Sequence, residues 1–551
     1  MTPARLPVVL LWHMHQPEYR VDGVWQLPWT YLHALKGYTD MAAHIEAEDG
    51  ACAVFNFTPV LLEQLRDYAQ YLRAAVTDDR PIPDPLLDGL RALPPAGAAR
   101  TLALVLAARA DPGPVAQRDP RWRPTAARIG AMAQPGLLAD GETRDFLVQT
   151  HLVWLGESLR TDARAKALIE RGRDYAAQDA RALLALIADV LGGLLQRYRR
   201  LWEQGRIELS VTPYQHPIVP LLLDFRVAAE SAPGVVLPAS GYPGGEARAR
   251  WHIGQGLQTF ESVFGRRPAG CWPAEAALSE ETLALLAESG FRWTASSASV
   301  LRATEQHHGV MNAHPHRAYR SNGHATLCLF RDDGLSDRLG FVYQHWQAQD
   351  ALQDLLRHAV QIAAAGPDRE LLLIALDGEN PWGWYPDNGI HFVRGLYRAL
   401  AEHPRLRPAL PAALLDAGLA AAPLPRLQAG SWVSGQLLTW IGHPEKNRAW
   451  QLLIEAKQHY DAAGPQTPET LRQLGVCEAS DWFWWPGETN PTPAVADFDA
   501  LFRAQLRSLY RRLGQTAPAA LEHAFSRGSA REVAHGGTMR PTQTPGGSTN
   551  A

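Results

Sequence analysis

A stretch of about 18 uninterrupted apolar residues, the minimum for a membrane-spanning helix, is absent from this sequence of 551 residues. Basic residues (53) do not exceed acidic residues (57), and the net charge of −4 offers no basic surplus for nucleic acid or an anionic membrane. The apolar run at residues 7–12 is too short for a secretion signal, and no A-x-A cleavage site follows it. We therefore expect a cytoplasmic protein with neither a nucleic-acid nor a membrane partner.

Cysteine is scarce and has no pattern. The four cysteines, Cys52, Cys271, Cys328 and Cys477, show no CxxC spacing, so we expect buried free thiols in a reducing compartment. No G-x-G-x-x-G fingerprint follows a predicted strand, and no Walker A sequence is present. These absences argue against a nucleotide-binding enzyme.

Tryptophan, in contrast, outnumbers phenylalanine by 18 to 14. Many of the indoles lie in clusters with polar neighbours, namely Trp25 and Trp29, Trp382 and Trp384, and Trp482, Trp484 and Trp485. Flat indole faces bordered by polar groups are typical of sugar-binding sites. Ordinary core packing is the alternative for about half of them.

Strand-like apolar runs recur along the chain, and a polar segment follows each of them. The runs are residues 8–12, 51–57, 207–211, 269–272, 291–295, 325–330 and 371–376. Helical periodicity appears between several of them, at residues 279–288, 350–365 and 392–401. The alternation predicts an α/β fold with a parallel sheet, buried on both faces. Functional groups then belong at the carboxyl ends of the strands, in a barrel or in an open doubly wound sheet alike.

The domain prediction follows from the positions at which this alternation of strands and helices is interrupted. We expect a catalytic domain over residues 1–400, with a helical insertion at about 64–204, and a helical C-terminal domain over 401–526 that contributes to the cleft. Residues 527–551 lack an apolar pattern and are predicted to be disordered.

Glu275 follows a short predicted strand in the run Cys271-Trp272-Pro273-Ala274-Glu275. Because Pro273 restricts the backbone, the carboxylate follows a stiff turn and can point into the mouth of a barrel. The alternative is a glutamate in the first turn of a helix, where the helix dipole favours it.

Asp377 ends the most apolar predicted strand, residues 371–376. Burial at a strand end raises the pKa of a carboxyl group, as a general acid requires near neutral pH. Trp382, Trp384 and Asn388 follow closely and can line a sugar site. The alternative is a helix-capping or turn aspartate. With Glu275, a carboxyl separation of about 5–5.5 Å implies retention, and about 6.5–9.5 Å implies inversion.

His13 and His15 lie two residues apart at a strand end, so both point to the same face. They can bind hydroxyl groups or, together with Asp332, Asp377 and His216, hold a divalent metal. The metal interpretation would fit a metal-dependent sugar deacetylase or mannosidase.

Arg331 and Asp332 follow the strand-like run at 325–330. An arginine at a strand end can pair with a catalytic carboxylate and keep it ionised. A salt-bridged turn at the surface explains the same residues almost as well.

Four motifs, in order, resemble family 57 of the glycoside hydrolases, in its α-amylase and amylopullulanase branch. They are His13-Met14-His15-Gln16-Pro17, Ile207–Tyr214 with His216-Pro217, Trp272–Ser279, and Leu376–Trp382. Further similar blocks are Phe330–Gly340, Ser431-Trp432, Trp440–His443 and Ser480–Trp485. The resemblance extends from about Val8 to Tyr510.

The resemblance implies an incomplete, TIM-like (β/α)7 barrel with a helical C-terminal region, a retaining mechanism, and neither a cofactor nor a catalytic metal. It assigns Glu275 as the nucleophile and Asp377 as the acid/base. The substrate-binding residues that we predict are His13, His15, Gln16, His216, Trp272, Arg331, Asp332, Trp382, Trp440, Asp481 and Trp484. Ser297 stands where many relatives carry aspartate, and Gln16-Pro17-Glu18 departs from the pattern of the branching enzymes.

We therefore predict a hydrolase of α-amylase or amylopullulanase type, with an α-glucan or malto-oligosaccharide as its substrate. A 4-α-glucanotransferase with the same carboxylate pair is the first alternative. The alternatives from other classes are the metal-dependent deacetylase or mannosidase and a non-catalytic carbohydrate-binding protein.

Overall fold

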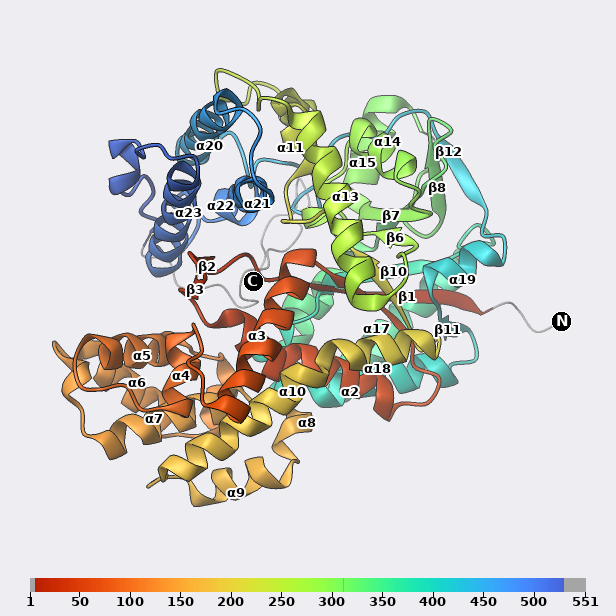
Figure 1. Ribbon diagram of the computed structural model, residues 1–551. Coiled ribbons are helices and arrows are strands. Elements are labelled where there is room, and N and C mark those ends of the chain that lie inside the picture. Colours follow the sequence, from red (N-terminus) through yellow and green to blue (C-terminus); the bar gives the residue numbers. More distant parts are fainter. Residues whose placement is uncertain (1–4, 311, 530–551) are drawn as a thin grey trace.

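A parallel β-barrel forms the centre of the molecule (Figure 1). The computed structural model describes residues 5–310 and 312–529. The barrel strands are β1 (Leu6–Met14), β4 (Ala53–Phe57), β5 (Ile207–Val211), β6 (Gly270–Cys271), β7 (Trp293–Ser297), β9 (Leu327–Arg331) and β10 (Leu372–Asp377). They pair in this order, β10 also pairs with β1, and all of these pairings are parallel.

The ring closes between β9 and β10 through one register position, Leu373 opposite Arg331. This closure confirms the seven-stranded barrel and excludes the open doubly wound sheet. Six consecutive positions pair β10 with β1 on its other side, from Val8–Leu372 to His13–Asp377. The seam between β9 and β10 is therefore the weaker of the two sides of β10.

Alternate residues of each strand face opposite sides of the barrel wall. In β1, Val9 and Leu11 belong to the core cluster that also contains Leu329 and Leu373 from other strands, which marks the barrel interior. Val8 and Leu10 belong to the larger cluster that the surrounding helices form. Both faces are apolar, which explains why the strands read as continuous hydrophobic runs.

The helices predicted between strands are present. They are α14 (Glu280–Glu288), α17 (Ala348–Ala364) and α18 (Ile390–Glu402), and α13 (Gly245–Phe264) and α15 (Ala298–His308) accompany them. Ser279 caps α14 by accepting from the N–H of Thr282, as expected of a serine before a Glu-Glu start.

Helices fill the chain between β4 and β5 and form the lower left of Figure 1. They are α3 (Pro59–Asp78), α4 (Pro85–Arg91), α5 (Ala98–Arg109), α6 (Trp122–Ala131), α7 (Asp140–Trp154), α8 (Glu157–Arg160), α9 (Ala163–Arg171) and α10 (Ala177–Glu203). Before them, α1 (Trp29–His33), the π-helix η1 (Ala34–Tyr38) and α2 (Thr39–Ala47) connect β1 to β4.

The sheet continues beyond residue 401 before the C-terminal helices begin. Strand β11 (Leu406–Pro408) pairs with β1, and β12 (Ala421–Leu424) pairs with β8 (Ala318–Ser321), which runs antiparallel to β9. The domain boundary that we placed at residue 401 stays a prediction.

The C-terminal helices form the upper left of Figure 1. They are α20 (Pro444–Ala462), α21 (Pro468–Cys477), α22 (Asp481–Trp484) and α23 (Thr492–Arg512). Within the predicted tail, Ser529 exchanges backbone hydrogen bonds with Asn490 and Thr492, and residues 530–551 lie outside the described part. No helix in the described ranges is long and apolar enough to cross a membrane. The four cysteines carry free thiols, and three of them are buried.

Candidate active site

A cavity of about 820 Å³ lies at the carboxyl ends of the barrel strands. Three regions of the chain contribute to its lining. His13 and Asp377 come from the barrel, Asp111 comes from the helical insertion, and Trp432 and Asp481 come from the C-terminal part. The C-terminal part therefore supplies side chains to this lining.

Glu275 lies at the rim of β6 in an unusual backbone conformation. Its φ of 56° is left-handed, a region that non-glycine residues rarely adopt. Trp432 fixes it twice, because its backbone N–H donates to the carbonyl oxygen of Glu275 at 3.1 Å and its indole Nε1 donates to Oε2 at 2.9 Å. A donor at the carboxylate favours the ionised form.

Asp377 is the last residue of β10 and lies opposite His13 of β1 in the strand register. It is 9% exposed, and its Oδ2 accepts a hydrogen bond from Asn380 Nδ2 at 2.8 Å. Burial raises the pKa of Asp377 to about 6, and this effect outweighs the opposing effects of Asn380, His15 and Arg331. The strand end therefore gives Asp377 the environment of a general acid.

Glu379, two residues further on, also lines the cavity, although the sequence analysis did not select it. It is buried, and its Oε1 accepts hydrogen bonds from Tyr38 Oη at 3.0 Å, the His15 N–H at 3.2 Å and Gln16 Nε2 at 3.3 Å. Burial, and then the charge of Asp377, raise the pKa of Glu379 well above its ordinary value. The protonated form of Glu379 is therefore favoured over that of a solvent-exposed glutamate. Its position in the Asp377-Gly378-Glu379-Asn380 run was the only sequence signal.

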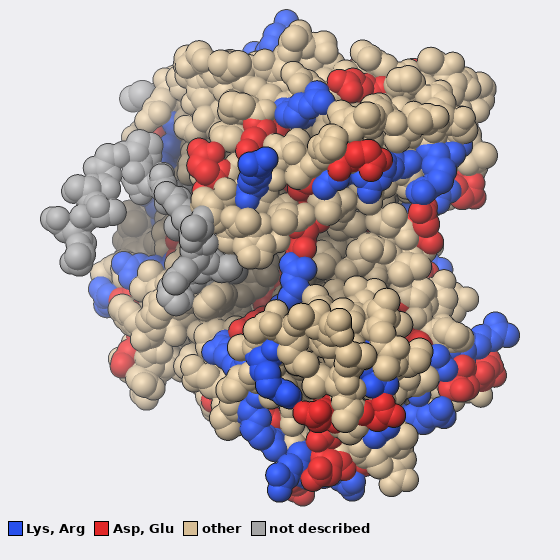
Figure 2. Space-filling view, turned by 90° about the vertical axis from the view of Figure 1, so that its left-hand side faces the viewer, with Lys and Arg blue, Asp and Glu red and all other residues tan. Residues whose placement is uncertain are grey.

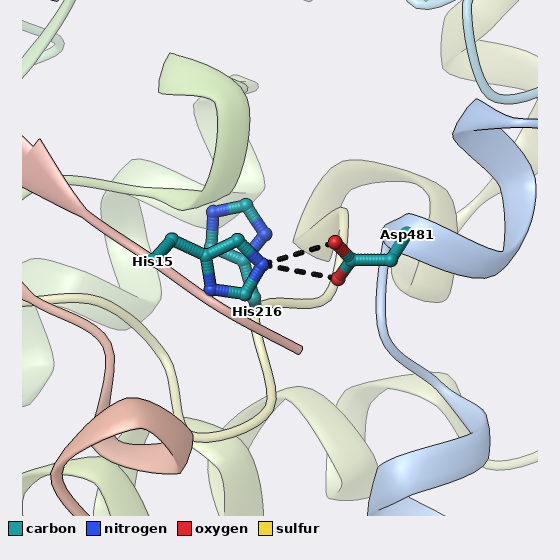
Figure 3. A group of neighbouring side chains, drawn as sticks. All are labelled: His15, His216 and Asp481. Carbon is teal, nitrogen blue, oxygen red and sulfur yellow. Dashed lines mark hydrogen bonds and ion pairs between the residues drawn. The ribbon is translucent and has the colours of Figure 1, made fainter. Parts of the chain in front are cut away.

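His13 of β1, His15 directly after it and His216 in the loop after β5 form a stack of imidazole rings. Figure 3 shows His15 and His216 of this stack with Asp481. The rings of His15 and His216 are 3.8 Å apart, and His13 Nε2 lies 3.2 Å from His216 Nε2. His15 Nε2 contacts both carboxylate oxygens of Asp481 at 3.1 Å, and His13 Nδ1 lies 2.6 Å from Asn56 Oδ1. Burial lowers the pKa of His13 to about 3 and that of His216 well below its ordinary value, so both are neutral.

His15, His216 and Asp481 also form a group that can hold a metal ion, since one ligand atom from each lies within 4.8 Å of the others. Asp332 does not belong to it, contrary to the prediction. Asp332 instead accepts from the N–H of Leu335, as the cap of the short helix α16 (Asp333–Asp337), and from His316 Nε2 at 2.8 Å. A capping role thus replaces the predicted substrate contact of Asp332.

Arg331 ends β9 and is buried, so the surface-turn alternative is wrong. It donates to Asp333 Oδ1 at 3.0 Å and to Asp337 Oδ1 at 2.8 Å. Its Nη1 reaches the carbonyl oxygen of Ala375 in β10 at 3.0 Å, and the guanidinium lies 5.4 Å from the centroid of the Trp432 ring. Arg331 thus lines the cavity and crosses the seam of the barrel.

Five of the predicted substrate-binding residues, besides Arg331, line the cavity. They are His13, His15, Gln16, Asp481 and Trp484. His216 lies behind them, in the histidine stack.

Three further predicted tryptophans are buried and do not line the cavity, and their role in sugar contact stays a prediction. Trp272 packs edge-on against Trp432, with ring centroids 5.3 Å apart. Trp382 Nε1 donates to the carbonyl oxygen of Gly378 at 3.0 Å, and the ring of Trp440 lies 5.7 Å from that of Trp484. Each supports a part of the lining, because its indole packs inward.

The surface has no broad area of a single charge on the face shown in Figure 2, where basic and acidic side chains are interspersed. Inside the cavity the balance is acidic, since seven carboxyl-bearing and three basic side chains line it. The carboxyl-bearing residues are Asp111, Glu275, Asp337, Asp377, Glu379, Asp481 and Asp497, and the basic ones are Lys36, Arg123 and Arg331.

The sequence model of glycosyl hydrolase family 57 matches residues 141–415, a range that includes Glu275 and Asp377. No curated protein matches the sequence.

Among solved structures, a family 57 branching enzyme from Thermococcus kodakaraensis is similar at 15% identity and a TM-score of 0.53, over 98% of this chain and 100% of that one. The family 57 branching enzyme from Pyrococcus horikoshii gives 15% and 0.55 over the same shares. The α-amylase AmyC from Thermotoga maritima gives 12% and 0.55, over 93% of each chain. The architecture extends over nearly the whole of these enzymes.

Proposed function

Because this chain belongs to glycosyl hydrolase family 57, we propose that it is a retaining glycoside hydrolase that cleaves α-glucosidic bonds. Its substrates are α-glucans such as glycogen, starch or maltodextrin. The observation that supports the proposal is the contrast between the two carboxyl groups that line one cavity, Glu275 and Asp377. Glu275 accepts a hydrogen bond from an indole, whereas burial raises the pKa of Asp377 to about 6. Such contrasting environments separate a nucleophile from a general acid.

In the first step Asp377 gives its proton to the glycosidic oxygen while the carboxylate of Glu275 attacks the anomeric carbon. The bond from this carbon to the leaving oxygen breaks, and a glycosyl ester forms on Glu275. In the second step Asp377 takes a proton from water, the water oxygen attacks the anomeric carbon, and Glu275 is released as a carboxylate. The sugar therefore keeps its α configuration.

His13, His15 and Asp481 surround the position of the sugar that is attacked. His13 and His15 stand at the end of β1, next to Asp377 in the strand register, and Asp481 faces His15 from α22. Imidazole rings and a carboxylate offer both donors and acceptors to sugar hydroxyl groups. Trp484 adds an indole to the same lining.

A 4-α-glucanotransferase is the second candidate. Trp29 and Trp154 line the cavity on the side of the helical insertion, where an acceptor sugar can be held. If this sugar displaces water, its hydroxyl group resolves the glycosyl ester. The two reactions use the same carboxyl pair and differ only in the acceptor.

Product analysis of the purified chain on amylose, pullulan and maltotriose tests the proposal. We expect reducing ends to increase, with the newly formed end in the α configuration by proton NMR. Glu275→Gln and Asp377→Asn should each lose nearly all turnover, whereas Glu246→Gln, at an exposed position of α13, should keep it. Longer oligosaccharides from maltotriose without a gain in reducing ends would indicate the transferase. Full activity of either carboxyl variant would refute the mechanism.

A further inference from the structure

A second group of side chains lines the cavity and includes the two indoles named above for an acceptor sugar. Trp29, His33, Lys36 and Trp154 come from α1, η1 and the end of α7, and all four line the cavity. We call them the insertion-side cluster. The rings of Trp29 and Trp154 lie 6.1 Å apart, and His33 meets Trp154 edge-on at 5.3 Å.

Lys36 is the least expected member, because lysine is rarely buried without a partner. It is 3% exposed, and in the described part of the chain its ammonium has no hydrogen-bonding or ion-pair partner. The ammonium nitrogen Nζ lies over the ring of Trp154, 4.7 Å from the ring centroid. His33 Nδ1 is likewise buried with no hydrogen-bond partner in the described ranges. His33 Nδ1 is thus unsatisfied beside the cavity, at a cost that a bound ligand would remove, and the ammonium of Lys36 faces the same cavity.

The surrounding backbone leaves space for this amine. Lys36 lies in the π-helix η1, a form that is frequent at functional sites. A Cβ atom added at Gly383 would lie 2.8 Å from Lys36 Nζ, and one at Gly37 would lie 3.1 Å from the Cα of Glu379. Lys36 therefore borders the segment that follows Asp377, on the wall of the cavity that the general acid occupies.

The charges of the cavity favour a neutral ligand over an anion. Carboxyl-bearing side chains outnumber basic ones by seven to three in the lining. Burial, and then the charge of Arg118, lower the pKa of Lys36 to about 8, so it still carries its proton near neutral pH, as one cation in a lining where carboxyl groups predominate. Indole faces with hydrogen-bond donors at their edges match the apolar faces and hydroxyl groups of a sugar ring.

We propose that the insertion-side cluster is a binding subsite for a glucosyl unit on the leaving-group side of the cleaved bond, with Lys36 as hydrogen-bond donor to its hydroxyl groups. The subsite rests on the proposed function, since it holds a further unit of the same glucan. It would make affinity depend on chain length, because only a chain that extends past Asp377 reaches it.

Calorimetric titration of maltose, maltotriose and maltoheptaose into inactive Glu275→Gln protein, with and without Lys36→Met, tests the subsite. Methionine keeps an unbranched apolar stem as far as the Cε position and removes the amine. A hydrogen bond from a charged donor corresponds to about a tenfold change in affinity, so we expect maltoheptaose to bind about tenfold more weakly. The loss for maltose should be several times smaller.

Lys457→Met in the same background is the matched control. Lys457 is equally buried, at 4% exposed, but lies in α20 and pairs with Asp461 outside the cavity. The affinities of this double variant for the three sugars should match those of Glu275→Gln alone. Gly383→Ala is the second variant, because its methyl group displaces the amine without removing it and should give the same dependence on chain length.

The possible results separate the two proposals. If Glu275→Gln binds none of the three sugars, the proposed function itself is wrong. If it binds them and Lys36→Met and Gly383→Ala leave maltoheptaose unaffected, only the subsite is wrong. If Lys36→Met lowers the affinity equally for all three sugars and does not change the unfolding temperature of the protein, the subsite is also wrong.

Discussion

The indole Nε1 of Trp432 donates a 2.9 Å hydrogen bond to Oε2 of Glu275. The backbone N–H of the same tryptophan donates to the carbonyl oxygen of Glu275 at 3.1 Å, so one residue holds both the main chain and the side chain of the proposed nucleophile. Glu275 has a φ of 56°, a conformation that costs energy and persists only where neighbours enforce it. Trp432 in turn packs on Trp272 and faces Arg331, which fixes its indole.

Trp432→Phe should reduce turnover while the fold is kept. Phenylalanine retains most of the packing on Trp272 but removes the donor to Glu275. We expect kcat/KM to fall by roughly tenfold, the equivalent of one hydrogen bond to a charged group. Steady-state kinetics on amylose measure this, with Trp346→Phe, at a position 40% exposed, as the control. Unchanged kinetics would show that the indole does not position the nucleophile.

The dependence of activity on pH should follow the titration of Asp377. The general acid must be protonated, and burial raises the pKa of Asp377 to about 6, so kcat/KM should fall as the pH rises above about 6. Asn380 lowers this pKa through its hydrogen bond. Asn380→Ala should therefore move the alkaline limb of the profile to higher pH. A limb that moves to lower pH would contradict the assigned role.

Asp377→Asn should stabilise the protein at neutral pH. The raised pKa means that the contribution of the protonated carboxyl group is complete below pH 3.8 and is lost as the pH rises through about 6. Asparagine removes the cost of the buried charge, on the order of 3 kcal/mol for a shift of this size. Denaturant unfolding at pH 7.5 should show the gain, and unfolding near pH 3.5 should show none. A variant less stable than the parent at pH 7.5 would refute the raised pKa.

Glu379→Gln should have only a small effect on turnover and stability, whereas Glu379→Ala should have a large one. Because burial and the charge of Asp377 favour the protonated form of Glu379, glutamine is a close substitute for it and still accepts from Tyr38, Gln16 and the N–H of His15. We expect glutamine to keep activity within about threefold, and alanine to cost about 2–4 kcal/mol by leaving buried donors unpaired. Thermal unfolding and turnover together measure the difference. A glutamine variant as impaired as the alanine variant would mean that Glu379 is ionised.

The sequence was sufficient to predict features that depend on the pattern of residues close together in the chain. The apolar runs of the strands, each followed by a polar segment, located the two carboxyl groups, and Ser279 marked a helix start. Whether the sheet closes was not decided, because closure depends on the contact of Leu373 with Arg331, far apart in the chain. The resemblance to a family supplied that part of the prediction.

The sequence did not indicate the direction in which the side chains of three predicted tryptophans point. Trp272, Trp382 and Trp440 have the same composition around them as cavity-lining indoles, and only the packing of the folded chain turns them inward. Lys36 was missed because nothing in the local sequence distinguishes it from a surface lysine. Its burial results from the meeting of η1, α7 and the segment after Asp377.

The seam between β9 and β10 limits which residues of this enzyme can be replaced as its specificity evolves. The strands share one register position, and the guanidinium of Arg331 links them again by binding the carbonyl oxygen of Ala375. The same guanidinium faces the indole that holds Glu275. Replacement of Arg331 would therefore loosen the scaffold and disturb the reaction together. New specificities should arise more readily from the insertion and the C-terminal helices, whose side chains shape the cleft without joining strands.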